Sequence, residues 1–555
     1  MPKWTEEQLK IINSNKKLLV VNAVAGSGKT STLMGIALKN INKNILYLVY
    51  NRAMKKEAEE KFKKYNLKNI EVKTAHGLAY KYYSKKNLVN NLNIIEISEK
   101  YKLSYKSAKN YINLYNKFLQ SKYTSIEEFI NYFREYIFYS FDLKNKLLKD
   151  IKNFIILNEA RYEKKLESLD TSILLSKLLY DYLLIKIENK KSKNRDEILE
   201  EKDSYILKSI ELNFELLQKD ELLINYYDTI KTILNKIFDD MNNERLPQIH
   251  DHYLKLYQLY REKELFYEIV LLDEAQDSNG VIIDIIENKF PNAKKIIVGD
   301  TNQQLYAFRG AINAMEYFMK LENSTIMYLT HSFRIGSELA DFVNKILKLK
   351  QNNITIVGKN INQKIIEDFK DEKILVLART NAGLFEYAIE NLDKKLFFFR
   401  KIDFSALKDC YSLYCGNRKN INSEIKKYKS FSQLEKYIEE NLELNSEIVL
   451  SFNLIKKYGH NMKNYLEKID KSICKNKNEA NIFLSTVHAA KGLEYKNVYL
   501  LNDFMNINET LKILDRSKDN VFFYKKIKKW FYEELNIIYV ALTRSSKNLK
   551  HTICL

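Results

Sequence analysis

Cysteine, proline and glycine are scarce in this sequence of 555 residues, which holds four cysteines, three prolines and 13 glycines. Four scattered cysteines are too few for a disulfide framework, and Cys410 and Cys415 lack the second pair of ligands that a zinc site needs. No apolar run reaches the ~18 residues that span a bilayer, and the amino terminus does not resemble a signal peptide. We therefore expect a soluble, intracellular protein without a membrane partner.

One other pattern offers possible metal ligands, the sequence His250-Asp-His252 that follows Pro247. A zinc site needs three or four ligands, and no third ligand lies nearby in the sequence. The pattern therefore favours a solvated loop over a metal site.

Basic residues outnumber acidic ones: the chain has 91 lysines and arginines and 71 aspartates and glutamates, which gives a formal net charge of +20. An excess of this size favours a polyanionic partner such as nucleic acid. The lysines are spread along the whole chain rather than gathered in blocks, so the composition of an AT-rich genome is a competing explanation.

The scarcity of glycine and proline also indicates how the chain is organised. No glycine occurs between Gly77 and Gly280, and the only proline there is Pro247. Apolar residues recur at three- and four-residue spacing through this stretch, which predicts an all-helical insertion over 77–264. A second helical, glycine-poor stretch covers 402–480.

Short apolar strands, each followed by a polar turn, flank these insertions. Strands that alternate with helices imply a parallel sheet covered on both faces. The sequence therefore predicts two α/β domains, each with a helical insertion. The first set of strands is 18–22, 45–50, 70–73, 269–272, 295–298 and 326–329, and the second set is 374–378, 396–399, 482–486 and 498–501.

The first strand runs directly into Ala25-Gly-Ser-Gly-Lys-Thr30. A glycine turn between a strand and a helix aims backbone N–H groups and a helix N-terminus at one point, which binds phosphate. In the full pattern Lys29 reaches the β- and γ-phosphates and the Thr30 hydroxyl can ligate Mg²⁺. The chain has Ala23 where that pattern asks for glycine, so the signal for a nucleotide site is strong but imperfect.

Strand 269–272 delivers Asp273-Glu-Ala-Gln-Asp277 to its carboxyl end, where ligands bind in α/β proteins. Asp273 can hold Mg²⁺ opposite Thr30, and Glu274 can orient and deprotonate an attacking water. Two adjacent acids also occur in solvated turns, but their place after a buried strand favours the catalytic interpretation.

The loop after strand 295–298 contains Gln303, whose amide can sense a γ-phosphate by hydrogen bonding. Tyr306, Phe308 and Arg309 lie close together further along this loop. Rings and a guanidinium offer stacking surfaces for unpaired bases, each worth ~1–3 kcal/mol per base. For any one ring, burial in the core of the next helix is an equally good interpretation.

Taken in this order, the motifs resemble those of superfamily 1 DNA helicases of the UvrD/Rep type, over about residues 5–549. Within that group, Val298–Asn313, Leu329–Gly336 and Arg379–Ala382 look most like the F-box DNA helicases. The family's glutamine motif resembles Thr5-Glu-Glu-Gln8, its fifth motif Ser485–Glu494 and its sixth motif Tyr539–Arg544. The glutamine motif begins at residue 5, which leaves no room before it for an F-box. We therefore expect no F-box-dependent ubiquitin-ligase partner, and no fused nuclease after the sixth motif.

The resemblance implies an α/β fold of two RecA-like parallel-sheet domains, as in P-loop NTPases, each with a mainly helical insertion. The first domain would comprise 1–76 and 265–330, with 77–264 inserted, and the second 331–401 and 481–555, with 402–480 inserted. It also implies ATP and Mg²⁺ as cofactors, single-stranded or forked DNA as the substrate, and movement in the 3′-to-5′ direction.

The resemblance further implies roles for individual residues. Gln8 would read the adenine edge and Phe333 would stack on adenine, while Arg334 and the arginine finger Arg544 would reach the γ-phosphate from the second domain. ATP would then bridge the two domains.

The implied catalytic residues are Lys29, Glu274, Gln303, Arg334 and Arg544. The implied metal ligands are Thr30 and Asp273. The implied nucleotide-binding residues are Gln8, Ala25, Gly26, Ser27, Gly28, Lys29, Thr30, Ser31, Phe333, Arg334, Gly492, Glu494 and Arg544. The implied DNA-binding residues are Tyr50, Asn51, Thr74, His76, Tyr306, Phe308, Arg309, Thr486 and His488.

Two other functions stay open. The first is a translocase that strips recombinase from DNA and unwinds poorly. It is favoured because the second insertion is small here, whereas the equivalent region of UvrD-type enzymes is larger. The second is an ATPase or defence subunit that acts only with partners. We expect a monomer whose protein partners are recombinase or repair proteins. It would act in the cytoplasm or nucleoid of a bacterium, or in the nucleus of a eukaryote. The residues themselves carry no signal for polarity or for DNA over RNA.

Overall fold

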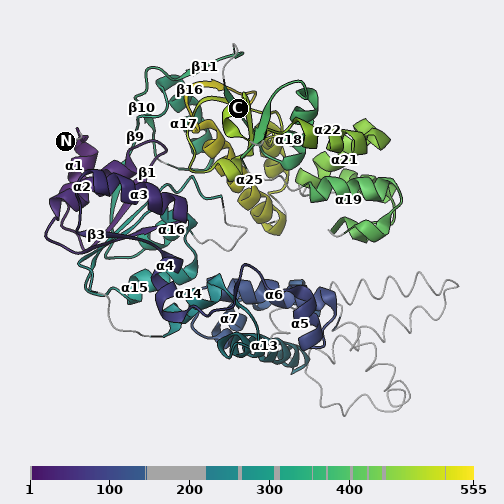
Figure 1. The fold of residues 1–555 in the computed structure, drawn as a ribbon, viewed down its shortest axis with the longest axis horizontal. Helices are drawn as coiled ribbons and strands as arrows, with labels where there is room; N and C mark the ends of the chain where they lie inside the picture. Colours follow the sequence, from purple (N-terminus) through teal and green to yellow (C-terminus); the bar gives the residue numbers. More distant parts are fainter. Residues whose placement is uncertain are drawn as a thin grey trace. The chain divides into compact units, whose positions relative to one another are not determined.

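The computed structural model describes residues 3–143, 146, 221–260, 266–305, 313–352, 354–369, 373–399, 404–421, 424–440, 446–474, 476–518 and 521–555. The chain divides into two compact units (Figure 1). The first unit comprises Met1–Val72, Tyr267–Ser278 and Asn292–Leu555, and the second comprises Lys73–Phe266 and Asn279–Pro291. Among the described residues, no helix is long and apolar enough to cross a membrane.

The first unit holds two six-stranded sheets. In the first sheet the strand order is β3-β2-β6-β7-β1-β8, and its recorded pairings are parallel. All residues of β1, β2 and β6 are buried, as expected where helices cover both faces. Because β6, β7 and β1 are neighbours, the turns that follow them emerge together at one edge. The strands are β1 (Leu18–Ala23), β2 (Ile45–Val49), β3 (Ile70–Thr74), β6 (Ile269–Leu272), β7 (Lys294–Gly299) and β8 (Thr325–Leu329).

The helices around the first sheet begin where the sequence supplies caps. Thr5 and Gln8 form a capping box at the start of α1 (Glu6–Asn13), and Asn51 caps α3 (Arg52–Lys64) through the N–H of Met54. Apolar residues of the helices and strands form one core cluster, which includes Ile11, Leu33 and Phe62. The remaining helices here are α2 (Lys29–Lys39) and α16 (Ala314–Met319).

The second sheet has the order β11-β16-β15-β12-β14-β13, and all its pairings are parallel. The prediction of two parallel α/β sheets is therefore confirmed, although the strand expected at 498–501 already begins at Tyr495. The strands are β11 (Lys364–Ile365), β12 (Ile374–Ala378), β13 (Leu396–Phe398), β14 (Ile482–Thr486), β15 (Tyr495–Leu500) and β16 (Ser545–Lys550). A separate pair is β9 (His331–Ser332) and β10 (Val357–Gly358).

The core of the second sheet extends to the loops of the first. Val24, Ala25 and Leu305, which follow β1 and β7, belong to the same hydrophobic cluster as Leu339 and Tyr539. This shared cluster holds the phosphate-loop region against the second sheet. The helices around that sheet are α17 (Ser337–Leu349), α18 (Asn381–Glu390), α23 (Val487–Ala490), α24 (Ile507–Arg516) and α25 (Val521–Leu542).

The expected second insertion is helical. Its apolar residues, among them Leu407, Ile425 and Phe452, form a cluster with residues of β12, β14 and α18. The described helices between 404 and 474 are α19 (Ser405–Tyr414), α20 (Phe431–Glu440), α21 (Ser446–Tyr458) and α22 (Met462–Ser472), with short 3₁₀ turns η4 (Arg418–Asn420), η5 (Glu424–Lys427) and η6 (Gly459–Asn461). A further turn, η7 (Lys477–Glu479), precedes β14.

The second unit is mostly helical, but the prediction of an all-helical insertion is wrong at one point. The two short strands β4 (Leu88–Val89) and β5 (Gln248–Ile249) pair in parallel. Gln248 fixes this pairing, because its side chain accepts from Lys85 N (2.9 Å) and donates to Tyr83 O (3.2 Å). Strands of two residues are too short to show alternation in the sequence. The part of the predicted insertion over 147–220 lies outside the described residues.

Some described helices of this unit pack around an apolar cluster that includes Tyr115, Phe118, Phe129, Leu234 and Ile237. They are α5 (Ile94–Lys100), α6 (Tyr105–Gln120), α7 (Ile126–Tyr132), α8 (Arg134–Ser140) and α13 (Glu221–Asn242). Another helix, α14 (His250–Leu259), contacts α6, α4 (Ala75–Tyr83) and α15 (Gly280–Asn288).

The prediction that His250-Asp-His252 forms a solvated loop is also wrong, because these residues begin α14. The His252 ring is fully buried, and its Nε2 donates to Asn242 Oδ1 at 2.9 Å while its Nδ1 accepts from Tyr115 OH at 2.7 Å. Both ring nitrogens are thus satisfied in the neutral form. No group of three histidine, cysteine or acidic side chains placed to hold a metal occurs in the described part of the chain.

Acidification should destabilise this unit through His252. Burial lowers the pKa of His252 from 6.5 to about 3, so between these values the unfolded chain binds a proton that the folded chain does not. Stability should therefore fall as the pH drops below 6.5, by ~1.4 kcal/mol per pH unit for this residue. Thermal unfolding from pH 7 to 5 should show a shallower pH slope for His252→Gln than for wild type. Equal slopes in the two proteins would contradict the prediction.

Candidate active site

The phosphate loop depends on its two glycines for both conformation and space. Gly26 and Gly28 have φ angles of +74° and +81°, in the left-handed region that favours glycine. A Cβ on Gly26 would lie 2.5 Å from the Cβ of Arg334, and one on Gly28 would lie 2.7 Å from Gln8 Nε2. The loop therefore closes tightly, and α2 begins directly after it at Lys29 with its N-terminus aimed at the loop.

Gln8 lies against this loop, as its predicted role requires. Its Oε1 accepts from Thr5 N at 2.9 Å, and its Nε2 lies 3.5 Å from the carbonyl oxygens of Ser27 and Gly28. The capping box of α1 thus sets the position of the side chain expected to read adenine.

One polar atom inside the loop has no partner. The Ser27 side chain is 2% exposed, and its Oγ makes no hydrogen bond to any described residue. A buried hydroxyl without a partner costs free energy unless a bound group satisfies it. The loop therefore fits a ligand with hydrogen-bond acceptors, as a phosphate is.

The two acids after β6 have different surroundings. Glu274 lies 3.6 Å from Lys29 Nζ and accepts from Gln276 Nε2 at 2.5 Å. Burial opposes its ionisation, but Lys29 and Lys491 outweigh burial and lower the pKa of Glu274 to about 2. Glu274 also holds a left-handed backbone with φ of +52°, a strained conformation of the kind found at functional sites. It is a carboxylate held ionised at the edge of the sheet.

Asp273 lacks a contacting cation in the described residues. Its Oδ2 accepts from Tyr47 OH at 2.6 Å and its Oδ1 from the N–H of Glu274 at 2.9 Å. Burial and the charge of Glu274 raise the pKa of Asp273 to about 6. A buried carboxylate in this state is stabilised by a bound cation, so Asp273 fits the predicted role of Mg²⁺ ligand with Thr30.

The two predicted arginines approach from the second sheet. Arg334 donates from Nε to Glu494 Oε2 at 2.8 Å and from Nη1 to Thr543 O at 3.1 Å. Arg544 is 2% exposed and its Nη2 lies 3.4 Å from Gln303 Oε1. Burial and the nearby charge of Arg334 lower the pKa of Arg544 to about 9, and the charge of Arg544 in turn favours the ionised form of Glu274.

The structure therefore brings the five predicted catalytic residues into one cluster. Lys29, Glu274 and Gln303 come from the first sheet and its helices, and Arg334 and Arg544 from the segments around the second sheet. Glu494, which was expected to face the nucleotide, pairs with Arg334. Phe333 is 52% exposed, so its ring is accessible for stacking.

Direct hydrogen bonds also join the phosphate loop to the second group of motifs. Ser332 Oγ donates to Ala25 O at 2.7 Å, and the N–H of Phe333 donates to Gly26 O at 2.9 Å. The N–H of Ala25 donates to Tyr539 OH at 3.1 Å, and that hydroxyl donates to Asp300 Oδ2 at 2.8 Å. Tyr539 thus connects the phosphate loop with the loop that carries Gln303.

Tyr539 and Lys491 are two residues of this site that the sequence analysis missed. Lys491 Nζ contacts Asp277 Oδ2 at 2.5 Å and also donates to Gln303 O. The side chains of this pair are 8% and 2% exposed. Lys491 lies in the fifth motif, Ser485–Glu494, and Tyr539 begins the sixth, Tyr539–Arg544. The charge of Lys491 among small and apolar neighbours was the available signal.

Comparison with known proteins decides the family. The family model described as the UvrD/REP helicase N-terminal domain matches residues 4–326, and that of the UvrD-like helicase C-terminal domain matches residues 307–555. The chain belongs to the UvrD/REP helicase family. Its two sheets are accordingly the RecA-like P-loop domains of that family, as the sequence predicted.

Individual relatives of this UvrD/REP family chain are distant. F-box DNA helicase protein 1 of Schizosaccharomyces pombe is 31% identical over 330 residues, which is 55% of this chain and 36% of the relative. F-box DNA helicase 1 of Gallus gallus is 25% identical over 574 residues, 99% of this chain and 49% of the relative. ATP-dependent DNA helicase Rep of Buchnera aphidicola is 23% identical, over 65% of this chain and 79% of the relative. The chain thus spans half or less of the two F-box helicases.

The predicted DNA-binding residues of this UvrD/REP chain fall in several places. In the first unit, Tyr50 follows β2 and is 42% exposed, Asn51 caps α3, and Thr486 caps α23, which contains His488. In the second unit, Thr74 caps α4 through the N–H of Gly77, and His76 Nε2 donates to Asp251 Oδ1 at 2.9 Å. Tyr306, Phe308 and Arg309 lie outside the described residues.

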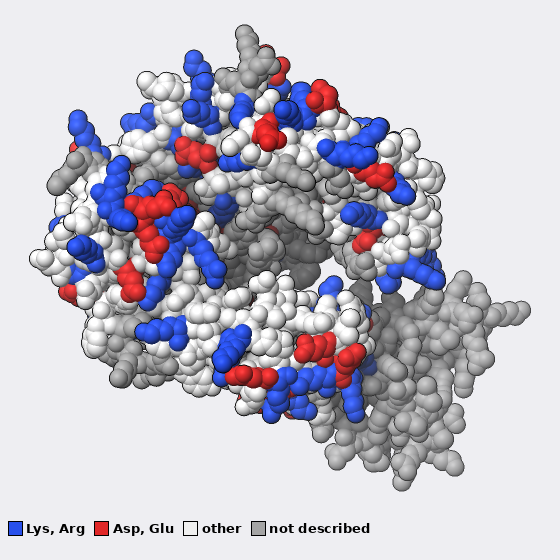
Figure 2. Space-filling view, in the orientation of Figure 1, with Lys and Arg blue, Asp and Glu red and all other residues white. Residues whose placement is uncertain are grey.

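Surface charge adds little to this picture. Figure 2 shows lysines and arginines scattered over the visible face, with acidic residues among them. On that face the net charge of +20 is not gathered into one basic patch. A DNA path is therefore better sought through the motif residues than through charge alone.

Removing Lys491 should destabilise the first unit. Burial outweighs the charge of Lys491 and raises the pKa of Asp277 to about 6, so Lys491→Met would leave a buried carboxylate without its partner. Breaking such a pair costs ~3–5 kcal/mol, which thermal unfolding should report as a lower midpoint. The double variant Lys491→Met, Asp277→Asn should recover part of the loss, and the exposed Lys496→Met should show none. A Lys491→Met protein as stable as wild type would show that the pair does not contribute.

Proposed function

We propose that this protein is an ATP-dependent DNA helicase or translocase that moves 3′ to 5′ on single-stranded DNA, in DNA repair or recombination. The observation that carries the proposal is the convergence of Lys29 and Glu274 from one sheet with Arg334 and Arg544 from the segments of the other. A nucleotide site formed by segments of two sheets changes its geometry when the ligand bound between them changes. ATP hydrolysis at this cluster can therefore drive movement.

The residues of the cluster have distinct tasks in hydrolysis. Lys29 and Lys491, with a smaller contribution from Arg544, keep Glu274 ionised, so its carboxylate can orient a water and accept its proton. Gln303 lies within reach of Arg544 and would report on the γ-phosphate. Bound Mg²⁺, held by Thr30 and Asp273, would supply positive charge to the phosphate oxygens.

The contacts between the segments of the two sheets suggest how the site is coupled to movement. Arg544 reaches Gln303, Lys491 reaches Asp277, and Tyr539 reaches both Ala25 and Asp300. Each contact joins a segment of the second sheet to a loop at the edge of the first. Changes at the γ-phosphate would alter these contacts and move the two sheets relative to each other. A DNA strand held by Tyr50, Thr486 and His488 would then be moved along.

Tailed duplexes test this proposal and its direction. The full chain with ATP and Mg²⁺ should separate a duplex with a 3′ single-stranded tail, and should leave a duplex with only a 5′ tail largely intact. The reverse preference would contradict the polarity. Unwinding of forked DNA by a Glu274→Gln protein would contradict the proposed use of ATP.

The same assay distinguishes the second candidate, a translocase that removes proteins from DNA. Such a protein would release a recombinase from a single strand in an ATP-dependent way while leaving the tailed duplexes paired. The small insertion between β13 and β14, which holds α19 to α22, favours this candidate.

A further inference from the structure

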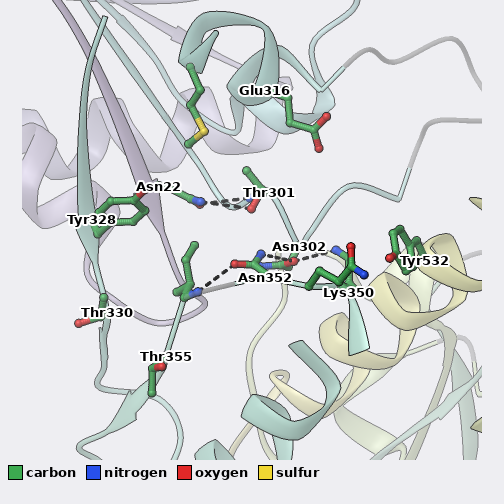
Figure 3. Close-up of a pocket in the computed structure, with 13 residues that line it drawn as sticks. Asn22, Thr301, Asn302, Glu316, Tyr328, Thr330, Lys350, Asn352, Thr355 and Tyr532 are labelled. Atoms are coloured by element: carbon green, nitrogen blue, oxygen red, sulfur yellow. Dashed lines mark hydrogen bonds between the residues drawn. The ribbon is translucent and has the colours of Figure 1, made fainter. Parts of the chain in front are cut away.

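A second pocket lies apart from the active site. It has a volume of about 810 Å³, within the ~300–1,000 Å³ that small-molecule sites occupy. It is formed by residues of β1, β8, α16 and α25, by the turn after β7 and by the segment that follows α17. None of its lining residues belongs to the cluster described above (Figure 3). Asn302, Glu316, Tyr328, Lys350, Asn352 and Tyr532 are the lining residues that matter for its chemistry.

The pocket holds one cation without a contacting anion. Lys350 ends α17, and its Nζ donates to Asn302 Oδ1 at 2.7 Å and to Asn536 Oδ1 at 2.6 Å. Among the described residues it makes no ion pair. Burial lowers its pKa to about 8, although the nearby charges of Asp300 and Glu316 oppose this shift. An ammonium has three N–H donors, so one remains for a bound group, and a bound anion would compensate the buried charge.

The wall beside Lys350 also has unused donors. Asn302 is fully buried, and its Oδ1 accepts from both Lys350 Nζ and Asn352 Nδ2, the latter at 3.1 Å. These two donors fix the orientation of the amide, because the flipped amide would point N–H groups at them. Asn302 Nδ2 then makes no hydrogen bond to any described residue. This wall therefore keeps an N–H donor without a described partner next to the Lys350 ammonium, a pair that suits an anionic group.

Two rings and one carboxylate complete the pocket. Figure 3 shows Tyr328 at one end, Lys350 and Tyr532 toward the other, and Glu316 above them. Tyr328 is 45% exposed, so its ring is accessible for stacking, and Glu316 can accept from an amino group. A ligand that matches has an anionic group at one end and a flat ring at the other.

We propose that this pocket binds a single nucleotide, with its phosphate toward Lys350 and its base on the Tyr328 ring. A nucleotide combines an anionic group and a flat, stacking base in one molecule. The same chemistry is offered by a free nucleoside monophosphate and by the terminal nucleotide of a strand. The site is separate from the one that the proposed ATPase function uses.

The test is calorimetric titration of deoxyadenosine monophosphate into the full chain, with the active site saturated by a non-hydrolysable ATP analogue and Mg²⁺. Wild type should bind the nucleotide, and Lys350→Met should bind it at least ~10-fold more weakly, as expected from losing ~1.4 kcal/mol of binding. Tyr328→Ser, a change at an exposed ring, should weaken binding to a similar degree. Lys348→Met, on the exposed side of the same helix, should bind like wild type.

Two results would overturn the proposal: no binding to wild type beyond the blocked active site, or equal binding by wild type, Lys350→Met and Tyr328→Ser. Dependence on Lys350 and Tyr328 is measured without hydrolysis, so it is independent of whether the protein proves to be a helicase. A 5′-phosphorylated strand of ten nucleotides, added as competitor, identifies the source. Displacement of the monophosphate assigns the pocket to strand ends, and lack of displacement assigns it to free nucleotides.

Discussion

Replacing Glu274 with glutamine is expected to reduce ATP hydrolysis by ~10²- to 10⁴-fold, the usual contribution of a general base. The carboxylate is ionised at neutral pH because its pKa is about 2, whereas an amide cannot accept a proton. Glutamine keeps the shape of the side chain and can still contact Gln276. The thermal midpoint should therefore change little, and steady-state hydrolysis with single-stranded DNA measures the effect.

A matched control lies just before the same strand. Glu268 is exposed, and its Oε2 accepts from the N–H of Asn44 at 3.1 Å, so Glu268→Gln should leave hydrolysis unchanged. Hydrolysis within threefold of wild type in Glu274→Gln would remove Glu274 from the role of general base. A loss of activity in both variants would point to a structural effect at β6.

Replacing Arg544 with lysine is expected to lower the rate of hydrolysis by ~10³- to 10⁵-fold, the contribution of an arginine finger. The guanidinium donates to Val540 O at 2.9 Å and to Leu493 O at 3.1 Å while its Nη2 faces Gln303. A lysine keeps the charge but loses the planar fork that makes these contacts together. Single-turnover hydrolysis separates this loss from a change in nucleotide affinity, which should stay within a few fold.

Because Arg544 is buried, its replacement also leaves backbone carbonyls without donors, and the variant must be shown to fold. Thermal unfolding and circular dichroism supply that check. Arg516→Lys, in the exposed last turn of α24, should hydrolyse ATP like wild type. Near-wild-type hydrolysis by a folded Arg544→Lys protein would leave Arg334 as the arginine that contacts the γ-phosphate.

Much of the first unit could be predicted from the sequence because its signals are local. Buried parallel strands read as continuous apolar runs, and strands such as 269–272 and 482–486 have the predicted ends. The phosphate loop was found because φ angles above zero demand glycine at positions 26 and 28. Lys29 and Glu274 were found from their local patterns, whereas Arg334 and Arg544 followed from the family resemblance.

The remaining features depend on partners far away in the sequence. Tyr539 is important because it meets Ala25 and Asp300, 514 and 239 residues away, and nothing near Tyr539 indicates either contact. His252 looked like part of a solvated loop because the sequence does not show that Tyr115 and Asn242 satisfy its ring. The pocket around Lys350 was missed for the same reason, since its lining residues come from six separate segments.

The central claim is that a nucleotide site formed by segments of both sheets couples ATP hydrolysis to movement along a DNA strand. The rate of hydrolysis with different polymers tests this claim most directly. The purified full chain should hydrolyse ATP slowly alone, much faster with single-stranded DNA, and less fast with single-stranded RNA. Stimulation by DNA should decline steeply as salt is raised, because phosphate contacts release counterions. A rate that is the same with DNA, with RNA and without polymer at every salt concentration would contradict the account.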